Sequence, residues 1–385
     1  MTTKTFIYGT ALLLMMTTAC ENDDKYTIDD FRDQTDTDTI EIAIAYSGNS
    51  ASVTGDNYGL VTTNGAHVTV NSASNKFLQL TLSGQTTDGS LLVYSQKKWE
   101  AVLNGVSIEN PQGPAINNQC GKSFYVTMAS GTTNTLTDGT AYAEALLNAS
   151  GDTIDQKATL FSEGQIYFRG AGSLSVSGHA KNGIASDDYL TFEQSGTITV
   201  NVDATGSNGL KANDGVFISS GTLTVSVAAD GARGIKNDPR MQMSGGTVSI
   251  TTTGDCKIET ANGVTDTTSC AAIKCDSLFT LSGGTLTLLS SGDGGKGINC
   301  SENFEQTGGT FSATTTGGND NGKPKAVKSD TGIILSGGSF YARCNKSWAC
   351  DNGSDSDEPR DRVTIKNGYT PVTESYAKRE VIVKF

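Results

Sequence analysis

The sequence is short of histidine and of positive charge. It has 2 His residues, and its 28 Lys and Arg are outnumbered by 41 Asp and Glu. His67 and His179 lie far apart and are not flanked by cysteine pairs, which argues against a zinc site. Because phosphate binding needs clustered Lys and Arg, the acidic balance argues against nucleic acid as a partner.

Long hydrophobic runs and common enzyme motifs are also missing. No segment beyond the N-terminal leader approaches the roughly 20 apolar residues of a membrane helix. A Gly-x-Ser-x-Gly elbow, a P-loop and a His-Glu-x-x-His motif are absent. Only 36% of residues are hydrophobic, whereas Gly accounts for 45 of 385. The glycines lack a three-residue period, which excludes collagen, so many tight turns are the remaining explanation.

The N-terminus resembles a bacterial lipoprotein signal peptide. The mostly apolar run 6–16 is too short to span a bilayer, and Thr17-Thr18-Ala19-Cys20 resembles a lipobox. The following Glu-Asn-Asp-Asp is similar to the surface-export signal of Bacteroidetes lipoproteins. We expect residues 1–19 to be a signal peptide, Cys20 to be lipidated and residues 20–39 to be a disordered tether. The expected location is the outer membrane or cell surface, held by the lipid anchor alone; the alternative is plain secretion.

A repeat of roughly 25 residues dominates the rest of the chain. Each repeat has an apolar anchor, the series being Ile184, Leu210, Ile235, Ile273, Ile298 and Val327. A glycine follows each anchor at a near-constant distance, and short segments after it alternate apolar and polar residues, which is the period of a strand. Phe217, Phe279 and Phe304 recur by repeat and are interpreted as core. The longer interval between Ile235 and Ile273 indicates an insertion at 254–268.

These features predict an all-β fold, a right-handed parallel β-helix solenoid over residues 40–385. Each coil (one turn of the solenoid) buries its inward side chains only by stacking on its neighbours, about 4.8 Å away. Its ends need covering, because exposed strand edges would pair with other chains. Residues 40–62 and 362–385 are the expected caps.

Several motifs resemble the bacterial carbohydrate-binding β-helix proteins. They are Ala101-Val-Leu-Asn-Gly-Val-Ser-Ile108, the segment 129–139 and Gly183-Ile-Ala-Ser-Asp-Asp-Tyr-Leu190. The resemblance covers roughly residues 40–340 and implies a topology like that of family nine polysaccharide lyases. It also implies binding of cellulose or acidic sugars, and calcium sites. The chain departs from the common Asp-Gly-Ile turn, with Asn182, Asn208, Arg233, Ala271 and Lys296 in place of the aspartate.

Stacking the coils brings polar residues into columns. The residue after the anchor forms a lysine column: Lys211, Lys236, Lys274 and Lys328. Two positions further on stand Asp238 and Asp276, on the same strand face as the lysines. The pattern allows interleaved ion pairing, which would offset a like-charge repulsion of about 1 kcal/mol in water. The alternative is calcium with an acidic polysaccharide, the candidate ligands being Asp230, Asp238, Asp255, Asp276 and Asp293.

Aromatic side chains supply candidates for contacts with neutral sugars. Tyr189 is the first, and the others are Tyr341, Trp99 and Trp348, although a single aromatic more often serves packing. Cysteines flank the predicted insertion and the C-terminal region, so disulfides are expected among Cys256, Cys270, Cys344 and Cys350, with the connectivity left open.

The expected function is polysaccharide binding without catalysis, for acidic or cellulosic glycans, with calcium as the expected cofactor. One alternative is a lyase acting on uronates, in which Lys236 or Lys274 would abstract a proton beside a cation. Another is a structural or adhesive surface protein whose partner is a protein, since a solenoid offers a long binding surface.

Overall fold

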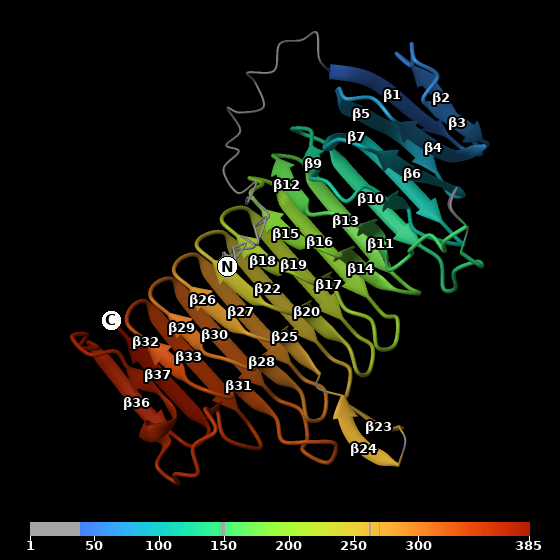
Figure 1. Cartoon of the computed structure of the whole chain (residues 1–385). Coiled ribbons are helices and arrows are strands. Elements are labelled where there is room, and N and C mark those ends of the chain that lie inside the picture. The colour runs from blue at the N-terminus through green and yellow to red at the C-terminus, as the bar shows by residue number, and fades with distance from the viewer. Residues whose placement is uncertain (1–38, 146, 148–150, 262, 269) are drawn as a thin grey trace, which may run out of the picture. The chain divides into compact units, whose positions relative to one another are not determined.

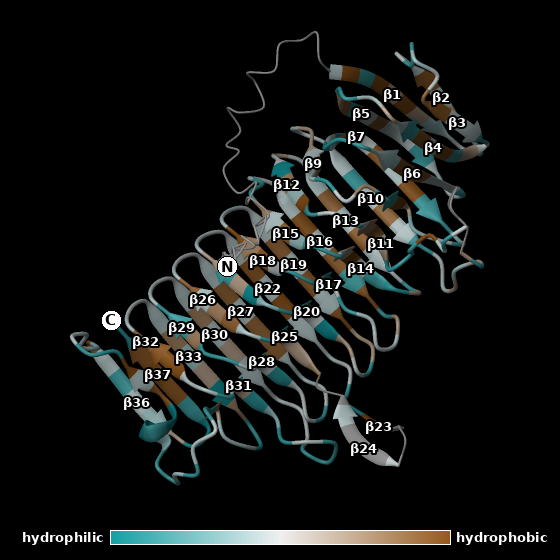
Figure 2. Ribbon diagram, viewed as in Figure 1, coloured by the Kyte–Doolittle hydropathy of each residue, from teal (hydrophilic) through white to brown (hydrophobic). Residues whose placement is uncertain are grey.

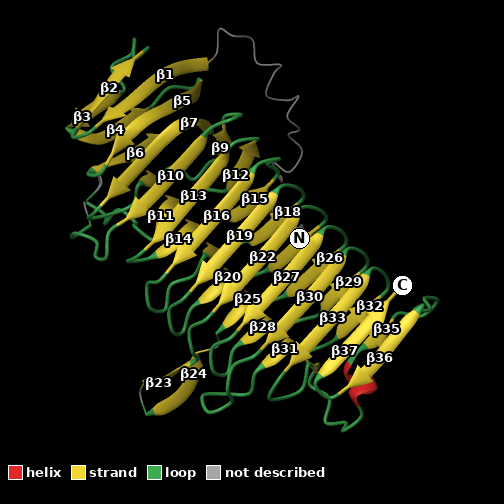
Figure 3. Cartoon of the chain, turned by 180° about the vertical axis from the view of Figure 1, so that it is seen from behind, coloured by secondary structure: helices red, strands yellow, loops and turns green. Residues whose placement is uncertain are grey.

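The computed structural model of the protein describes residues 39–145, 147, 151–261, 263–268 and 270–385 (Figure 1). Residues 40–385 form one compact unit. Strands dominate it, and the helix visible in Figure 3 is the short 3-10 helix η2 (Pro359–Arg362). The predicted signal peptide, Cys20 and nearly all of the predicted tether lie outside the described residues.

The chain winds as a parallel β-solenoid, which confirms the predicted fold class. Each central coil contributes three strands in turn, and equivalent strands of successive coils pair in parallel. The first strand of each coil joins a 12-stranded sheet. That sheet consists of β3 (Val61–Asn64), β4 (Ala66–Ser72), β6 (Gly89–Ser95), β8 (Ile116–Asn118), β11 (Ala158–Ser162), β14 (Asn182–Ser186), β17 (Leu210–Ala212), β20 (Arg233–Asn237), β25 (Ala271–Cys275), β28 (Lys296–Cys300), β31 (Lys325–Ser329) and β34 (Cys350–Asp351).

The other two strands of each coil build two further faces, joined near the N-terminal end through the long strands β5 and β7. The second face has β5 (Phe77–Thr86), β7 (Trp99–Asn110), β9 (Phe124–Met128), β12 (Ile166–Gly170), β15 (Tyr189–Phe192), β18 (Gly215–Ile218), β21 (Arg240–Met243), β26 (Leu278–Leu281), β29 (Phe304–Gln306), β32 (Ile333–Leu335) and β35 (Thr364–Ile365). The third has β10 (Thr133–Asp138), β13 (Ser173–Gly178), β16 (Thr197–Val202), β19 (Thr222–Val227), β22 (Thr247–Thr252), β27 (Thr285–Ser290), β30 (Thr310–Thr315) and β33 (Ser339–Cys344).

The core runs between the three faces as ladders of like residues. The apolar anchors of the repeat pair with one another in register, as Leu210 does with Ile235 and Ile235 with Ile273. Phe279 and Phe304 are fully buried, with ring centroids 5.2 Å apart. Trp99 is also buried and stacks on Phe124, so it is a core residue and not a sugar platform. Figure 2 shows the hydrophobic residues concentrated on the strands.

Antiparallel strands close the two ends, and a hairpin interrupts the series of coils. At the N-terminal end β1 (Thr39–Ser47) pairs antiparallel with β2 (Ser50–Thr54). At the C-terminal end β37 (Glu380–Lys384) pairs antiparallel with β33 and with β36 (Thr373–Ala377). The insertion predicted at 254–268 contains the antiparallel hairpin β23 (Lys257–Ala261) and β24 (Val264–Thr268).

Candidate functional site

The predicted lysine column lies on the 12-stranded sheet. Lys211 in β17 is in register with Lys236 in β20, which is in register with Lys274 in β25. Asn299 occupies the next position and Lys328 follows it, so the column has one interruption. These strands lie side by side in Figure 1. The sequence pattern therefore predicted the register of this column correctly.

Aspartates interleave with these lysines. The Lys236 ammonium lies 3.1 Å from Asp238 and 4.0 Å from Asp276, while Lys274 and Lys328 contact the aspartates two residues on. Burial opposes ionisation of Asp276, but its hydrogen bond to Lys274 and the nearby ammonium groups hold its pKa below the usual value. In the Lys211 coil Asn213 replaces the aspartate, and Lys211 has no ion-pair partner among the residues the structure describes.

A second cationic column, which sequence reasoning missed, runs beside the first. Arg233, Ala271, Lys296 and Lys325 pair in register at the start of successive strands of the same sheet. Burial lowers the pKa of the Lys296 ammonium. The sequence did contain a signal, because basic residues stand two positions before several anchors, where the common turn has an aspartate. We noted the missing aspartate and not the new positive charge. We call Arg233, Lys296 and Lys325 the basic column.

The predicted calcium ligands do not converge. Asp255 donates its backbone N–H to the Asp230 carboxylate at 2.8 Å and accepts the backbone N–H of Asp293 at 2.7 Å. These carboxylates therefore bind the backbone of the next coil, while Asp238 and Asp276 contact lysines. Across the described residues, no three of the five predicted aspartates group closely enough to share an ion. The five aspartates therefore do not form one shared cluster, and calcium, which takes six to eight oxygens, stays a prediction from the sequence.

A different group of carboxylates does converge, but it surrounds an ammonium. Asp155, Glu163 and Asp187 bring their oxygens together beside β11 and β14. Lys157 lies 2.6 Å from Asp155 and 2.5 Å from Asp187. Burial and the two neighbouring aspartates raise the pKa of Glu163. The Lys157 ammonium thus occupies the position between two of these carboxylates and offsets part of their negative charge.

Tyr189 lies on a different face from the lysine column. It belongs to β15, and its ring centroid is 5.8 Å from those of Tyr167 and Phe217. Phe217 points outward, with Arg240 5.3 Å from its ring centroid, so our interpretation of Phe217 as core was wrong. Arg169 lies 4.4 Å from the ring centroid of Tyr125 in the same group. The structure thus divides the predicted sugar-binding residues between two faces.

The four cysteines predicted to form disulfides are free thiols in the structure. Cys256 and Cys270 nevertheless lie together at the base of the β23–β24 hairpin, with the Cys270 backbone N–H donating to the Cys256 sulfur at 3.3 Å. Cys344 instead donates to the Pro324 carbonyl, and Cys350 is buried in β34. Neither predicted crosslink is present, although a sulfur hydrogen bond joins Cys256 and Cys270.

Comparison with known proteins adds the family. A family model for carbohydrate-binding domain-containing proteins matches residues 64–322, which covers most of the coils just described. The chain belongs to this family. A carbohydrate-binding domain-containing protein of Acetivibrio thermocellus is 34% identical over 124 residues, which is 31% of this chain and 41% of that relative. The match thus spans less than half of the relative's own length.

A solved structure shares the architecture. The polysaccharide lyase-like protein from C. thermocellum, studied as a gadolinium derivative, superimposes with a TM-score of 0.53 at 25% identity. The match covers 68% of this chain and 94% of that one. No helix among the described residues is long and apolar enough to cross a membrane.

Proposed function

We propose that the protein binds an acidic polysaccharide along the open face of the 12-stranded sheet and does not cleave it. The observation that carries this proposal is the in-register alignment of Lys211, Lys236 and Lys274 on adjacent coils. Successive coils lie about 4.8 Å apart, so the ammonium groups form a regular row along the sheet. Membership of a carbohydrate-binding family and the likeness to a polysaccharide lyase-like protein support a sugar chain as the ligand.

The binding chemistry follows from the exposed ion pairs of the row. Each lysine–aspartate pair at a surface contributes only about 0–1 kcal/mol, so a ligand carboxylate can replace the aspartate at little cost. Lys211 needs no such exchange. A repeating polyanion that engages several lysines at once gains avidity that one sugar alone does not have. We therefore expect weak binding of short fragments and stronger binding of long chains.

The same contacts weigh against lyase chemistry at the residues we considered. A lyase base must reach the proton that it abstracts from the uronate with an unoccupied nitrogen or oxygen. The Lys236 and Lys274 ammonium groups are each already ion-paired with an aspartate, so neither nitrogen is free to approach a substrate proton without breaking that pair. Calcium stays a prediction from the sequence, and no step of the proposed binding depends on it.

For the location, we propose a lipid anchor at Cys20 that holds the protein at the outer membrane or cell surface. The lipobox-like residues 17–20 and the acidic residues after them support this. The expected tether, residues 20–39, would then link the lipid anchor to the solenoid.

Affinity electrophoresis of the full chain tests the binding proposal. Gels contain polygalacturonate, soluble cellulose derivatives or a neutral glucan, with and without chelator. We expect retardation by polygalacturonate, and a reduction of that retardation in the triple variant Lys211→Met, Lys236→Met, Lys274→Met. The matched control, Lys97→Met, Lys98→Met, Lys366→Met, removes the same charge elsewhere and should behave like the parent.

The other outcomes discriminate between the alternatives. Equal retardation of the two triple variants would remove the lysine column as the site, and no retardation on any glycan would contradict polysaccharide binding. Loss of binding with chelator would establish a cation requirement. Appearance of unsaturated-uronate absorbance would establish a lyase, and capture of a protein partner without sugar binding would favour the adhesive alternative.

A further inference from the structure

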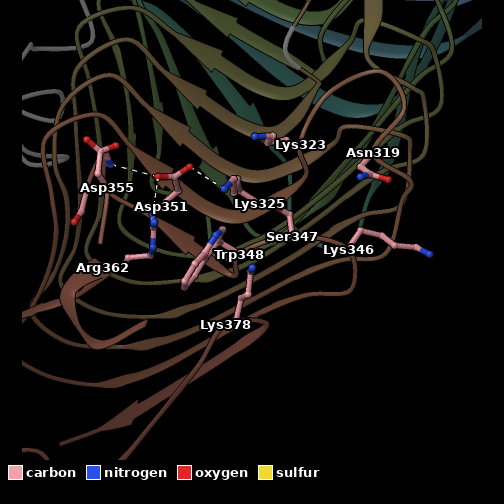
Figure 4. A pocket seen from close by; sticks show the side chains of 12 residues that line it. Asn319, Lys323, Lys325, Lys346, Ser347, Trp348, Asp351, Asp355, Arg362 and Lys378 are labelled. Carbon is pink, nitrogen blue, oxygen red and sulfur yellow. Dashed lines mark hydrogen bonds and ion pairs between the residues drawn. The ribbon is translucent and has the colours of Figure 1, made fainter. Parts of the chain in front are cut away.

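A cationic pocket lies where the two columns reach the C-terminal cap (Figure 4). Its volume is about 480 Å³, within the size range of small-ligand sites. Lys325 in its wall continues the basic column, and Asp351 is in register with Lys328 of the lysine column. We call it the terminal pocket. Its charged and aromatic lining residues follow residue 322, where the family match ends, and include Lys323, Lys325, Lys346, Trp348, Arg362 and Lys378.

The terminal pocket is positively charged in an acidic protein. Five cationic side chains and two aspartates, Asp351 and Asp355, line it, so its formal charge is 5 − 2 = +3. The whole chain carries −13. Such a local reversal of sign attracts anions to this place on the surface.

Two cations at the pocket wall are fixed and share one counter-charge. The side chains of Lys325 and Arg362 are 7% and 8% exposed, and they contact Asp351 at 2.8 and 3.2 Å. Burial opposes ionisation of Asp351, but the hydrogen bond and charge of Lys325 outweigh it and hold the pKa of Asp351 below its usual value. The Nε of Arg362 is buried without a hydrogen-bond partner among the described residues. This part of the wall therefore keeps one excess positive charge and an unmet donor.

Trp348 holds two of the cations in place. The Arg362 guanidinium carbon lies 4.1 Å from the ring centroid and the Lys378 ammonium 4.8 Å from it. Figure 4 labels the three side chains in the pocket. Cation–π contacts of this kind are favourable at a partly desolvated site. Trp348 is thus a positioning residue, since it limits the freedom of two cations without neutralising them.

We infer that the terminal pocket binds a sugar that bears an anionic group, either a carboxylate or a sulfate. Guanidinium and ammonium groups with fixed positions suit such oxyanions, and the polar lining suits the hydroxyls of a sugar. The proposed function supplies the premise that the ligand is a sugar. The other premises, namely the positive charge, the buried cations and the volume, come from the terminal pocket itself. In this proposal the end of an acidic glycan lies in the pocket, beyond Lys328 of the lysine column.

Single sugars test the terminal pocket separately from the lysine column, because one sugar cannot span several coils. The full chain is titrated with galacturonate, galactose 6-sulfate and galactose, with saturation-transfer NMR as the readout. We expect saturable binding of at least one anionic sugar and none of galactose. The double variant Lys346→Met, Lys378→Met should weaken that binding at least tenfold. The control Lys366→Met, Lys384→Met, which removes equal charge outside the pocket, should leave it unchanged.

Trp348 has its own test, since Phe keeps a ring for the cations and Leu does not. Trp348→Leu should lower affinity at least threefold and Trp348→Phe should restore most of it, with folding checked by circular dichroism. Equal binding of all three sugars, no binding, or a pocket variant that matches its control would overturn the inference. If the triple lysine-column variant loses polygalacturonate but keeps the single sugar, the pocket stands independently. If polygalacturonate binds and no single sugar does, the inference about the terminal pocket is wrong, whereas the proposed polysaccharide binding is not contradicted.

Discussion

Replacement of Gly292 by Ala should destabilise the solenoid far more than the size of a methyl group suggests. A Cβ on Gly292 would lie 1.8 Å from the carbonyl oxygen of Gly254 in the preceding coil, and a Cβ on Gly317 would lie 1.8 Å from the oxygen of Gly292. Real contacts of this kind exceed 3.0 Å, so neighbouring coils must separate by more than an ångström. The coils have little room to do so, because their backbones are hydrogen-bonded together.

The magnitude follows from the bonds that this separation would stretch. Ser291 donates to the Thr252 carbonyl at 2.9 Å next to the substituted position, and one or two such bonds would be lost. Each is worth about 1 kcal/mol, and overpacking adds about 1–3 kcal/mol. We expect a total loss of about 2–5 kcal/mol in the free energy of unfolding.

Urea unfolding monitored by far-ultraviolet circular dichroism measures this loss. The matched control is Gly121→Ala, because a Cβ there meets nothing within 4 Å and the residue has no positive φ. That variant should stay within about 0.5 kcal/mol of the parent, as surface substitutions usually do. Equal unfolding midpoints for the two variants would refute the close stacking of coils at Gly254, Gly292 and Gly317.

Three further predictions concern charges and cysteines. Asp255→Ala should cost about 1 kcal/mol, because the carboxylate accepts the Asp293 backbone N–H, whereas Asp255→Asn keeps an acceptor and should cost less. Urea midpoints with and without calcium check this. If Asp255→Asn is less stable than the parent only in the presence of calcium, Asp255 is instead a metal ligand. Cys20→Ala should abolish labelling by radioactive palmitate and release the protein from the membrane fraction; persistence of the label would place the lipid elsewhere. Oxidation should join Cys256 to Cys270, which already contact each other, and peptide mass spectrometry should find this crosslink and none to Cys344. A crosslink between Cys344 and Cys350 would contradict the contacts seen at Cys344.

The fold was predictable because the repeat carries its own register. Anchors such as Ile235 and Ile273 must stack inward to be buried at all, and that fixes which residues stand beside one another on the next coil. The alignment of Lys236 with Lys274 follows directly from it. The insertion at 254–268 was visible as the excess length between two anchors that still had to pair, but its hairpin structure was not predicted.

A one-residue difference explains the error at Phe217. Phe279 and Phe304 stand six positions after their anchors and point inward, where Val216 takes the same place in its own coil. Phe217 is one position later, and on a strand one residue reverses the face. The terminal pocket could not be predicted, because Arg362 and Lys378 belong to segments outside the repeat and no periodicity relates them to Lys325.

The two proposed sites differ in the burial of their charges, so salt should separate them. Added salt shortens the screening length from about 10 Å at 0.1 M to about 3 Å at 1 M, and buried charges are screened less than exposed ones. Polygalacturonate retardation by the lysine column should therefore fall severalfold as NaCl rises, since the side chains of Lys274 and Lys328 are 19% and 33% exposed, more than the two buried cations of the pocket wall.

Binding of an anionic single sugar at the terminal pocket should also fall with salt, because Lys346 and Lys378 are exposed, but it should fall less, because Lys325 and Arg362 are almost fully buried. Titrations of the parent and of the triple lysine-column variant at both salt concentrations measure the difference. The variant should lose the more salt-sensitive component and keep the less sensitive one. If salt weakens polygalacturonate binding and single-sugar binding by the parent equally, one exposed surface binds both ligands, and the lysine column and the terminal pocket are not separate sites.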